Sequence, residues 1–335
     1  MTVLRGITRA EVLASLRRFF AERGVHECWT SALCPAGGAD AAIASFSVGS
    51  ARLHTSPEFA MKRRIVARQA LGLSGDIYQV ATVFRRGEEG PLHRPCFSLL
   101  EWYRIDIDEM QLMSEVEAMV RFVARDVFEG RASGSGGQGS DDGWDGRVRW
   151  RGRSCSLDVP FSRLALAEQL RNAGVEVAPT CSEMGPSLVA ALGRLGERTD
   201  LDPVASFDLL YHHLGTTWAG IDMPAFVSGF PIEHASLAAL DDEAPLPARR
   251  FELVIAGVEV ANGWAELRGR AANEARLRVE NERRAALGID SETLDEDFLE
   301  AVDALPRCAG VALGIDRLHL LLAGADDIGA LEDLC

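Results

Sequence analysis

The chain lacks the features that would place it in a membrane or hold it together with disulfide bonds. No apolar run is long enough to cross a bilayer, and the N-terminus does not read as a signal peptide. The seven cysteines show no paired short spacing such as C-x-x-C, and their odd number argues against a disulfide framework. We therefore expect a protein of the reducing cytoplasm that has no membrane partner.

An excess of positive charge is also missing. The formal net charge is −15, so the overall field repels polyanions and general nucleic-acid binding is disfavoured. The 335 residues are 47% hydrophobic, which is enough to bury a large core, and the length slightly exceeds the usual size of a single core. We expect residues 1–335 to form a single catalytic domain that carries insertions.

The most informative stretch runs from Val83 to Arg104. Two apolar runs rich in β-forming residues flank a loop crowded with glycine, proline and charge, which predicts paired antiparallel strands. Arg85 closes the first strand and offers a fixed guanidinium fork to a phosphate, while His93 and Phe97 offer a donor and a flat face for a purine. An ordinary surface hairpin is the competing interpretation.

A second segment, residues 310–322, favours nucleotide binding. It is a small-residue apolar run that passes into a helical pattern, with Gly314 and Arg317 at the junction, and its glycines allow close backbone approach. Together the two segments resemble motifs 2 and 3 of class II aminoacyl-tRNA synthetases. The resemblance implies that Arg85 meets the α-phosphate of ATP and that Arg317 meets the γ-phosphate.

Further phrases narrow the resemblance to one branch of that class. They are TSPEFAMKR at 55–63, LEWYR at 100–104, RFE at 250–252, GVEVANGWAEL at 257–267 and CAGVALG at 308–314. Over about residues 5–325 the chain resembles the ligases that attach lysine to elongation factor P, which are paralogues of lysyl-tRNA synthetases. The resemblance implies an α+β fold with an antiparallel sheet flanked by helices, the use of ATP and Mg²⁺, and a homodimer.

Local patterns elsewhere are consistent with such a domain. Residues 8–24 predict an amphipathic helix that opens with a capping box, and the few residues before it leave no room for an N-terminal anticodon-binding domain. A Gly/Ser-rich linker is expected at about 130–142 and a mostly helical insertion at about 160–215. Strands are expected at 225–231 and 310–313, together with a hairpin that turns at Gly257.

Two carboxylates flank that hairpin. Glu252 and Glu259 lie on either side of the tight turn, so both could reach one site from neighbouring strands, and carboxylate oxygens are ligands that Mg²⁺ prefers. Two solvated glutamates at a strand edge are the alternative. By the resemblance, they are the metal-binding pair.

A second group of carboxylates indicates a cationic substrate. Glu58, Glu101 and Glu266 lie in phrases that line the amino-acid pocket of the resembled family, and three neighbouring anions take up protons unless cations join them. Lysine or (R)-β-lysine would bring two ammonium groups. The resemblance completes the pocket with Ser56, Tyr103, Ala261, Asn262 and Trp264. Trp264 stands where phenylalanine is usual. Ala261 stands where lysyl-tRNA synthetases tend to have glycine, and this alanine favours the ligase.

The function implied is that of an ATP-dependent ligase. It would activate lysine or (R)-β-lysine as an adenylate and transfer it to a lysine side chain of elongation factor P, by positioning and charge neutralisation without a protein nucleophile. The residues implied as catalytic are Arg85, Arg317 and Glu259, and those implied to bind ATP are Arg85, Glu88, His93, Phe97, Gly314 and Arg317.

Three departures from the family pattern leave alternatives open. Gly87 stands where motif 2 usually has a glutamate, although Glu88 follows it; Cys96 replaces another glutamate; and the proline of motif 1 is scarcely recognisable near Ser31. One alternative is a truncated lysyl-tRNA synthetase-like enzyme that loads tRNA, a carrier protein or a small molecule, with tRNA disfavoured for want of an anticodon reader. The other is a non-catalytic paralogue.

Overall fold

The computed structural model describes residues 6–38, 43–133, 144–217 and 222–334. The helices are α1 (Arg9–Ala21), α2 (Glu58–Ala70), α3 (Glu109–Ser133), α4 (Leu166–Asn172), α5 (Cys181–Leu195), α6 (Pro203–Thr217), α7 (Arg270–Ala286), α8 (Glu296–Asp303) and α9 (Ile315–Ala323), with 3₁₀ helices η1 (Ile232–His234) and η2 (Ile328–Leu334). The strands are β1 (His26–Glu27), β2 (Leu33–Cys34), β3 (Phe46–Val48), β4 (Ala51–Leu53), β5 (Ile77–Phe84), β6 (Cys96–Ile105), β7 (Arg147–Trp150), β8 (Arg153–Ser156), β9 (Ser162–Ala165), β10 (Ala225–Phe230), β11 (Ala248–Ile255), β12 (Val258–Ala265) and β13 (Cys308–Gly314).

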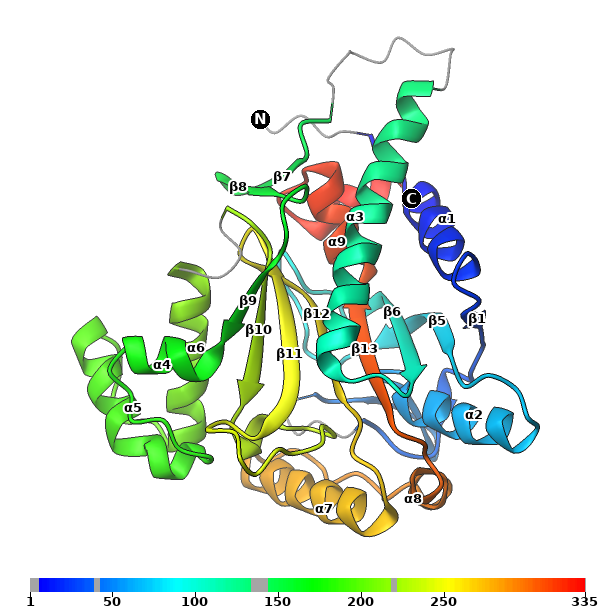
Figure 1. The fold of residues 1–335 in the computed structure, drawn as a ribbon. Helices are drawn as coiled ribbons and strands as arrows, with labels where there is room; N and C mark the ends of the chain where they lie inside the picture. Colours follow the sequence, from blue (N-terminus) through cyan, green and yellow to red (C-terminus); the bar gives the residue numbers. More distant parts are fainter. Residues whose placement is uncertain (1–5, 39–42, 134–143, 218–221, 335) are drawn as a thin grey trace.

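An eight-stranded sheet forms the centre of the molecule (Figure 1). Its strand order is β1-β5-β6-β13-β12-β11-β10-β9. Neighbouring strands from β5 to β10 are antiparallel, whereas the edge strands β1 and β9 each run parallel to their neighbours. The predicted α+β fold is confirmed, and the sheet is antiparallel except at its two edges.

Two hairpins within this sheet confirm the turns expected from the sequence. The first joins β5 and β6, and Phe84 and Cys96 form the last strand pair before the charged loop. The second joins β11 and β12 through Ala256 and Gly257, whose φ angles are 52° and 81°. Two consecutive positive φ values are typical of the type I′ turn, whose twist matches that of the flanking strands.

Strand alternation gives the sheet one core face and one open face. On β6 the side chains of Leu100 and Trp102 enter the main hydrophobic core, and on β13 those of Val311 and Leu313 do the same. Because successive residues of a strand point to opposite faces, the intervening residues, such as Glu101, are turned to the other face. Glu101 therefore lies on the face opposite the main core, together with most of the residues singled out from the sequence, although Ala261 is part of the core itself.

Helices α1 and α3 cover the core face. Thr8 caps α1, and its hydroxyl and the carboxylate of Glu11 form the predicted capping box. The buried residues of α1 are Val12, Ser15, Leu16, Phe19 and Phe20. In Figure 1, α3 crosses the sheet beside α1. Because α3 extends to Ser133, the first residues of the expected linker are helical, and the rest of that linker, from residue 134, lies outside the described residues.

The region at about 160–215 begins with a strand and continues as helices. Strand β9 adds the last strand to the sheet, and α4, α5 and α6 follow it. These helices share a hydrophobic cluster with β10 and β11 that is separate from the main core, and Figure 1 shows them beside the β9 and β10 edge. We refer to residues 166–217 as the helical insertion.

Among the described residues, six cysteines are free thiols. In the same part of the chain, no helix has both the length and the apolar character needed to span a membrane.

Candidate active site

A cavity on the open face of the sheet gathers the residues that the sequence singled out. Fifteen of them line it: Ser56, Glu58, Arg85, Glu88, His93, Phe97, Glu101, Tyr103, Glu259, Ala261, Asn262, Trp264, Glu266, Gly314 and Arg317. Glu252 is the exception, because it is 6% exposed and lies outside the lining. Long segments of chain separate these residues, so the fold has brought them together.

Small residues on β13 form the floor of the cavity. Gly310, Ala312 and Gly314 alternate with core residues and line the cavity. A Cβ atom on Gly310 would clash with the ring of Tyr103 and with Oε1 of Glu266. The strand register places Gly310 between Tyr103 of β6 and Trp264 of β12. The absence of a side chain at Gly310 thus leaves room for these two aromatic walls.

One end of the cavity is acidic. The carboxylate of Glu101 accepts hydrogen bonds from Oγ of Ser56 at 2.6 Å and from the hydroxyl of Tyr103 at 2.7 Å. Burial, followed by the charge of Glu58, raises the pKa of Glu101 to about 7, against the smaller opposing effect of these hydrogen bonds. A carboxyl with this pKa is poised to ionise when a cation arrives.

Lys62 holds the other two carboxylates of this end. Its Nζ atom lies 2.7 Å from Glu58 and 2.5 Å from Oε2 of Glu266, and its side chain is fully buried. Burial alone would lower the pKa of Lys62, but the two carboxylates outweigh burial and raise it, so the ammonium stays charged. Trp264 also donates to Oε2 of Glu266 at 3.0 Å. Oε1 of Glu266 has no hydrogen-bond partner within the described part of the chain.

Sequence reasoning missed the role of Lys62. It expected substrate ammonium groups to relieve the repulsion among three carboxylates, whereas the protein supplies one ammonium itself. A signal was present, because Lys62 follows Glu58 by one helical turn, a spacing at which side chains of opposite charge meet. Lys62 is also the sole lysine of the chain, and the other 34 of its 35 lysine and arginine residues are arginine. A compact ammonium fits between two buried carboxylates where a planar guanidinium would need more room.

The other end of the cavity is basic. The Nε atom of Arg85 donates to the carbonyl of Thr55 at 3.1 Å, and its guanidinium lies 5.0 Å from the centre of the Phe97 ring. Arg317, in the first turn of α9, donates through Nη1 to the carbonyl of Glu259 at 2.9 Å. These carbonyl acceptors orient the guanidinium groups. The neighbouring carboxylates, Glu88 at 3.4 Å from Arg85 and Glu259 at 3.7 Å from Arg317, are partly exposed, and such pairs are weak enough to leave both guanidinium groups accessible to an anion.

His93 links the loop of the first hairpin to this basic end. Its Nε2 atom lies 2.8 Å from Nη2 of Arg317. Burial, and then the charge of Arg317, lower the pKa of His93, so the neutral ring accepts this hydrogen bond. The loop and the start of α9 are thereby brought together over the cavity.

Two of the noted departures have clear structural consequences. Gly87 has a φ of 86°, a conformation that glycine adopts without strain, and Glu88 after it lines the cavity and accepts from Arg85 at 3.4 Å. Cys96 is exposed at the start of β6 and does not line the cavity. The family's glutamate is thus replaced by Glu88, one residue later, which still places a carboxylate beside Arg85. Cys96, by contrast, supplies no carboxylate to the cavity.

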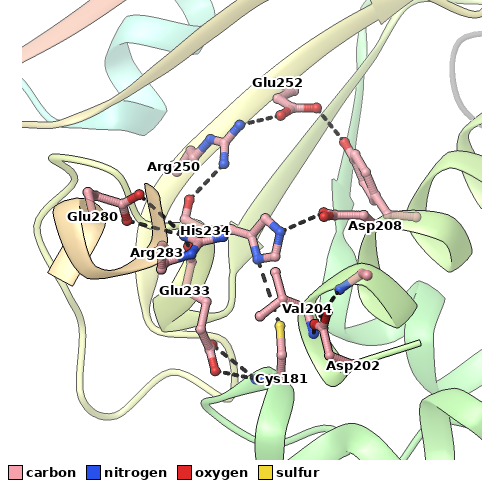
Figure 2. Close-up of polar contacts among 12 residues, drawn as sticks. Cys181, Asp202, Val204, Asp208, Glu233, His234, Arg250, Glu252, Glu280 and Arg283 are labelled. Atoms are coloured by element: carbon pink, nitrogen blue, oxygen red, sulfur yellow. Dashed lines mark hydrogen bonds and ion pairs between the residues drawn. The ribbon is translucent and has the colours of Figure 1, made fainter. Parts of the chain in front are cut away.

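Glu252 and Glu259 lie on neighbouring strands near the basic end. The carboxylate of Glu252 accepts from Arg250 through Oε1 and from the hydroxyl of Tyr211 through Oε2, the latter at 2.6 Å. Figure 2 shows Glu252 bridged to Arg250 in this way. Burial, followed by the charge of Glu259, raises the pKa of Glu252. A carboxylate has about four lone pairs, so two accepted hydrogen bonds leave Glu252 able to bind a cation.

Comparison with known proteins shows similarity to one family along most of the chain. Residues 5–331 match the family of tRNA synthetases class II (D, K and N). The chain is 35% identical over 331 residues to the elongation factor P-(R)-β-lysine ligase of Vibrio cholerae serotype O1, across 96% of this chain and 91% of that protein. It is 33% identical over 335 residues to the ligase of the same name from Proteus mirabilis, across 96% of this chain and 92% of that protein.

Proposed function

Because the chain belongs to the family of class II tRNA synthetases (D, K and N), and its relatives are named as elongation factor P ligases, we propose that it is an ATP-dependent ligase of the same kind. It activates lysine or (R)-β-lysine as an adenylate and transfers the aminoacyl group to a lysine side chain of elongation factor P. The observation that carries this proposal is the opposite charge of the two ends of one cavity.

The distance between the two ends suits an aminoacyl-adenylate. Phe97 and Glu101 both line the cavity from β6 and are four residues apart, which corresponds to roughly 13 Å along a strand. A purine on Phe97 would therefore lie about one nucleotide length from an ammonium on Glu101. The reacting carboxylate and α-phosphate would meet between them, close to Arg85.

Activation requires positioning and charge neutralisation only. An oxygen of the substrate carboxylate attacks the α-phosphorus of ATP, a new oxygen–phosphorus bond forms, and the bond to the pyrophosphate oxygen breaks. Arg85 would stabilise the charge that develops on the α-phosphate, and Arg317 would hold the departing pyrophosphate. In the second step the amine of the acceptor lysine attacks the acyl carbon, and AMP leaves as that amine loses a proton.

The acidic end would select the amines of the substrate. Glu101 becomes fully ionised when an ammonium reaches it, and Oε1 of Glu266, which has no partner among the described residues, offers a second acceptor. Tyr103 and Trp264 would enclose the aliphatic part of the chain between aromatic surfaces. A substrate with a single amine would leave one of these acceptors buried without a partner, which is costly.

We further propose that Glu252 and Glu259 hold Mg²⁺. The donor set fits, because the two carboxylates face the same side of the β11–β12 hairpin and their repulsion contributes to the raised pKa of Glu252. Glu252 and Glu259 would hold the ion there, and its positive charge would help to neutralise the phosphates of ATP. Glu259 is the more accessible of the two, since its side chain is 44% exposed, compared with 8% for Glu252.

A two-stage assay tests the proposed function. The purified protein is incubated with ATP and radiolabelled pyrophosphate, with lysine, (R)-β-lysine or norleucine, which lacks the second amine. We expect exchange with one or both diamino acids and none with norleucine. Elongation factor P is then added, and intact-mass measurement should show the gain of one aminoacyl group. Transfer to a tRNA transcript but not to elongation factor P would contradict the proposed acceptor, and the absence of exchange would contradict the proposed activity.

We propose that the protein is a cytoplasmic homodimer, as the resemblance to the family suggests. Light scattering after gel filtration should give about twice the chain mass of 36.3 kDa. A mass of one chain at micromolar concentration would contradict this.

A further inference from the structure

The helical insertion reaches one of the two carboxylates proposed to hold the metal. Tyr211 lies on α6, and its hydroxyl donates to Oε2 of Glu252 at 2.6 Å. Glu252 belongs to β11 of the central sheet, so this hydrogen bond joins two separate parts of the fold. Glu252 is buried and Tyr211 is half-buried, so the hydrogen bond is partly shielded from water.

A second route connects the same helix to the other oxygen of Glu252. Asp208, about one turn before Tyr211, contacts Nε2 of His234 at 2.7 Å. The carbonyl of His234 accepts from Nη1 of Arg250 at 2.7 Å, and Arg250 donates through Nη2 to Oε1 of Glu252. Figure 2 shows this chain of contacts running from Asp208 through His234 and Arg250 to Glu252. Helix α6 therefore influences both carboxylate oxygens, one directly and one through two intermediates.

Aromatic packing fixes the position from which Tyr211 donates. Its ring centre lies 5.9 Å from that of Phe207 and 5.6 Å from that of Phe230, the latter in an edge-to-face arrangement. Phe207 also packs at 4.5 Å against the ring of His234. A tyrosine held on several sides in this way presents its hydroxyl at a fixed point.

Cys181 completes this cluster without being a nucleophile. Its sulfur lies 3.8 Å from Nδ1 of His234, and His234 in turn contacts Asp208, which is the residue order of a catalytic relay. The thiol is fully buried, however, and burial, followed by the charge of Glu233, raises its pKa. A thiol of this kind is inert. The cluster therefore attaches the helical insertion to the sheet.

We propose that Tyr211 is a positioning residue for the metal and ATP site, so that the helical insertion sets the orientation of Glu252. This inference rests on the proposed function, in which Glu252 and Glu259 hold Mg²⁺. Tyr211 and Arg250 each occupy one lone pair of Glu252 and fix the plane of its carboxylate. Partners of this kind around a metal ligand typically contribute a factor of about 10 to 100 in metal affinity.

The test compares Tyr211→Phe with Tyr78→Phe. The control is closely matched, because Tyr78 also donates to a carboxylate, that of Glu27 at 3.1 Å, but lies outside the cavity. Each substitution removes one hydroxyl and keeps the ring. Binding of Mn²⁺ to each variant in the presence of ATP and without amino acid is measured by electron paramagnetic resonance. The Mg²⁺ dependence of pyrophosphate exchange, the KM for lysine and the melting temperature are measured in parallel.

We expect Tyr211→Phe to weaken Mn²⁺ binding about tenfold and to raise the Mg²⁺ requirement of exchange by a similar factor, with the KM for lysine changed less than about twofold. Tyr78→Phe should match the wild type in all three. Unchanged Mn²⁺ affinity in Tyr211→Phe would overturn the inference, as would an equal loss in both variants. If the wild type binds Mn²⁺ and ATP but shows no lysine-dependent exchange, the proposed function fails while the binding experiment still decides the role of Tyr211.

Discussion

The two ends of the cavity hold their charges in different ways. At the acidic end, Lys62 is fully buried and Glu266 is 1% exposed, and the ion pair between them is already complete in the free protein. At the basic end, the side chains of Arg85 and Arg317 are each 22% exposed and donate mainly to backbone carbonyls. The acidic end pairs two of its carboxylates with one buried ammonium, whereas at the basic end Glu88 and Glu259 lie 3.4 and 3.7 Å from partly exposed guanidinium groups.

This difference separates stability from activity. Removing one member of a buried ion pair leaves its partners charged and unsolvated, so changes at the acidic end should destabilise the fold. Removing an oriented but partly exposed guanidinium leaves no such buried charge, so changes at the basic end should lower the reaction rate and leave stability nearly intact. The predictions below test this contrast.

The largest effect is expected for Lys62→Met. It leaves Glu58 and Glu266 without their shared ammonium, and we expect the free energy of unfolding at neutral pH to fall by about 3–5 kcal/mol. Burial already raises the pKa of Glu266 to about 8 with Lys62 in place, and loss of the ammonium should raise it further. A carboxyl with a raised pKa destabilises the fold as pH rises through that pKa, so the deficit relative to the wild type should grow as pH rises above about 8.

Urea denaturation measures this deficit, with Arg64→Met as the control. Arg64 lies on the exposed side of the same helix and donates only to the carbonyl of Trp29 at 3.5 Å among the contacts described for it. We expect a change below about 0.5 kcal/mol for this surface substitution. If the two variants have the same free energy of unfolding, the buried ion pair does not contribute to the stability of the fold.

Arg85→Ala should have the next largest effect, and on activity alone. Loss of one group that stabilises transition-state charge typically costs a factor of about 10² to 10³ in rate, and we expect pyrophosphate exchange to fall by at least that much. Arg86→Ala is the matched control, because Arg86 is the next residue, is exposed and lies outside the cavity lining. A large drop in melting temperature for Arg85→Ala would contradict the proposal that changes at the basic end affect activity and not stability.

Substrate affinity should depend on pH through Glu101. With its pKa at about 7, Glu101 is protonated in the empty site at lower pH, yet an ammonium binds the ionised form. The affinity for lysine should therefore fall as pH drops below 7, by up to about tenfold per pH unit. Calorimetry across this range should show the effect in the wild type and none in Glu101→Gln.

Ser56→Ala sharpens the same measurement. Its hydroxyl donates to Glu101 and lowers the pKa of that carboxyl, so its removal should move the midpoint of the pH dependence upward. A midpoint that stays fixed in Ser56→Ala would assign the pH dependence to another group.

Glu88→Gln should give the smallest effect. Its contact with Arg85 at 3.4 Å is partly exposed, and such pairs contribute about 0–1 kcal/mol, so the KM for ATP should rise by about fivefold at most. Glu89→Gln, at an exposed neighbouring position, should leave the KM unchanged. A loss as large as that of Arg85→Ala would show that Glu88 contacts the nucleotide directly.

Much of the sheet could be predicted because the information is local. The turn at Gly257, the loop between β5 and β6, and the alternation of small and large residues on β13 are all visible within short stretches. The capping box of α1 is equally local. The parallel edge strands were not predicted, because β1 and β9 are short and their partners follow only after long stretches of chain.

The amino acid sequence by itself determined which faces of the strands carry chemistry, since alternation and turn residues act between near neighbours. The tertiary structure decided which charges are paired. Lys62 joins Glu58 to Glu266, and Tyr211 reaches Glu252, because helices far apart in the chain were brought against the sheet. Electrostatic energy in a buried site depends on distance and on solvent exclusion, and the packed fold alone fixes both.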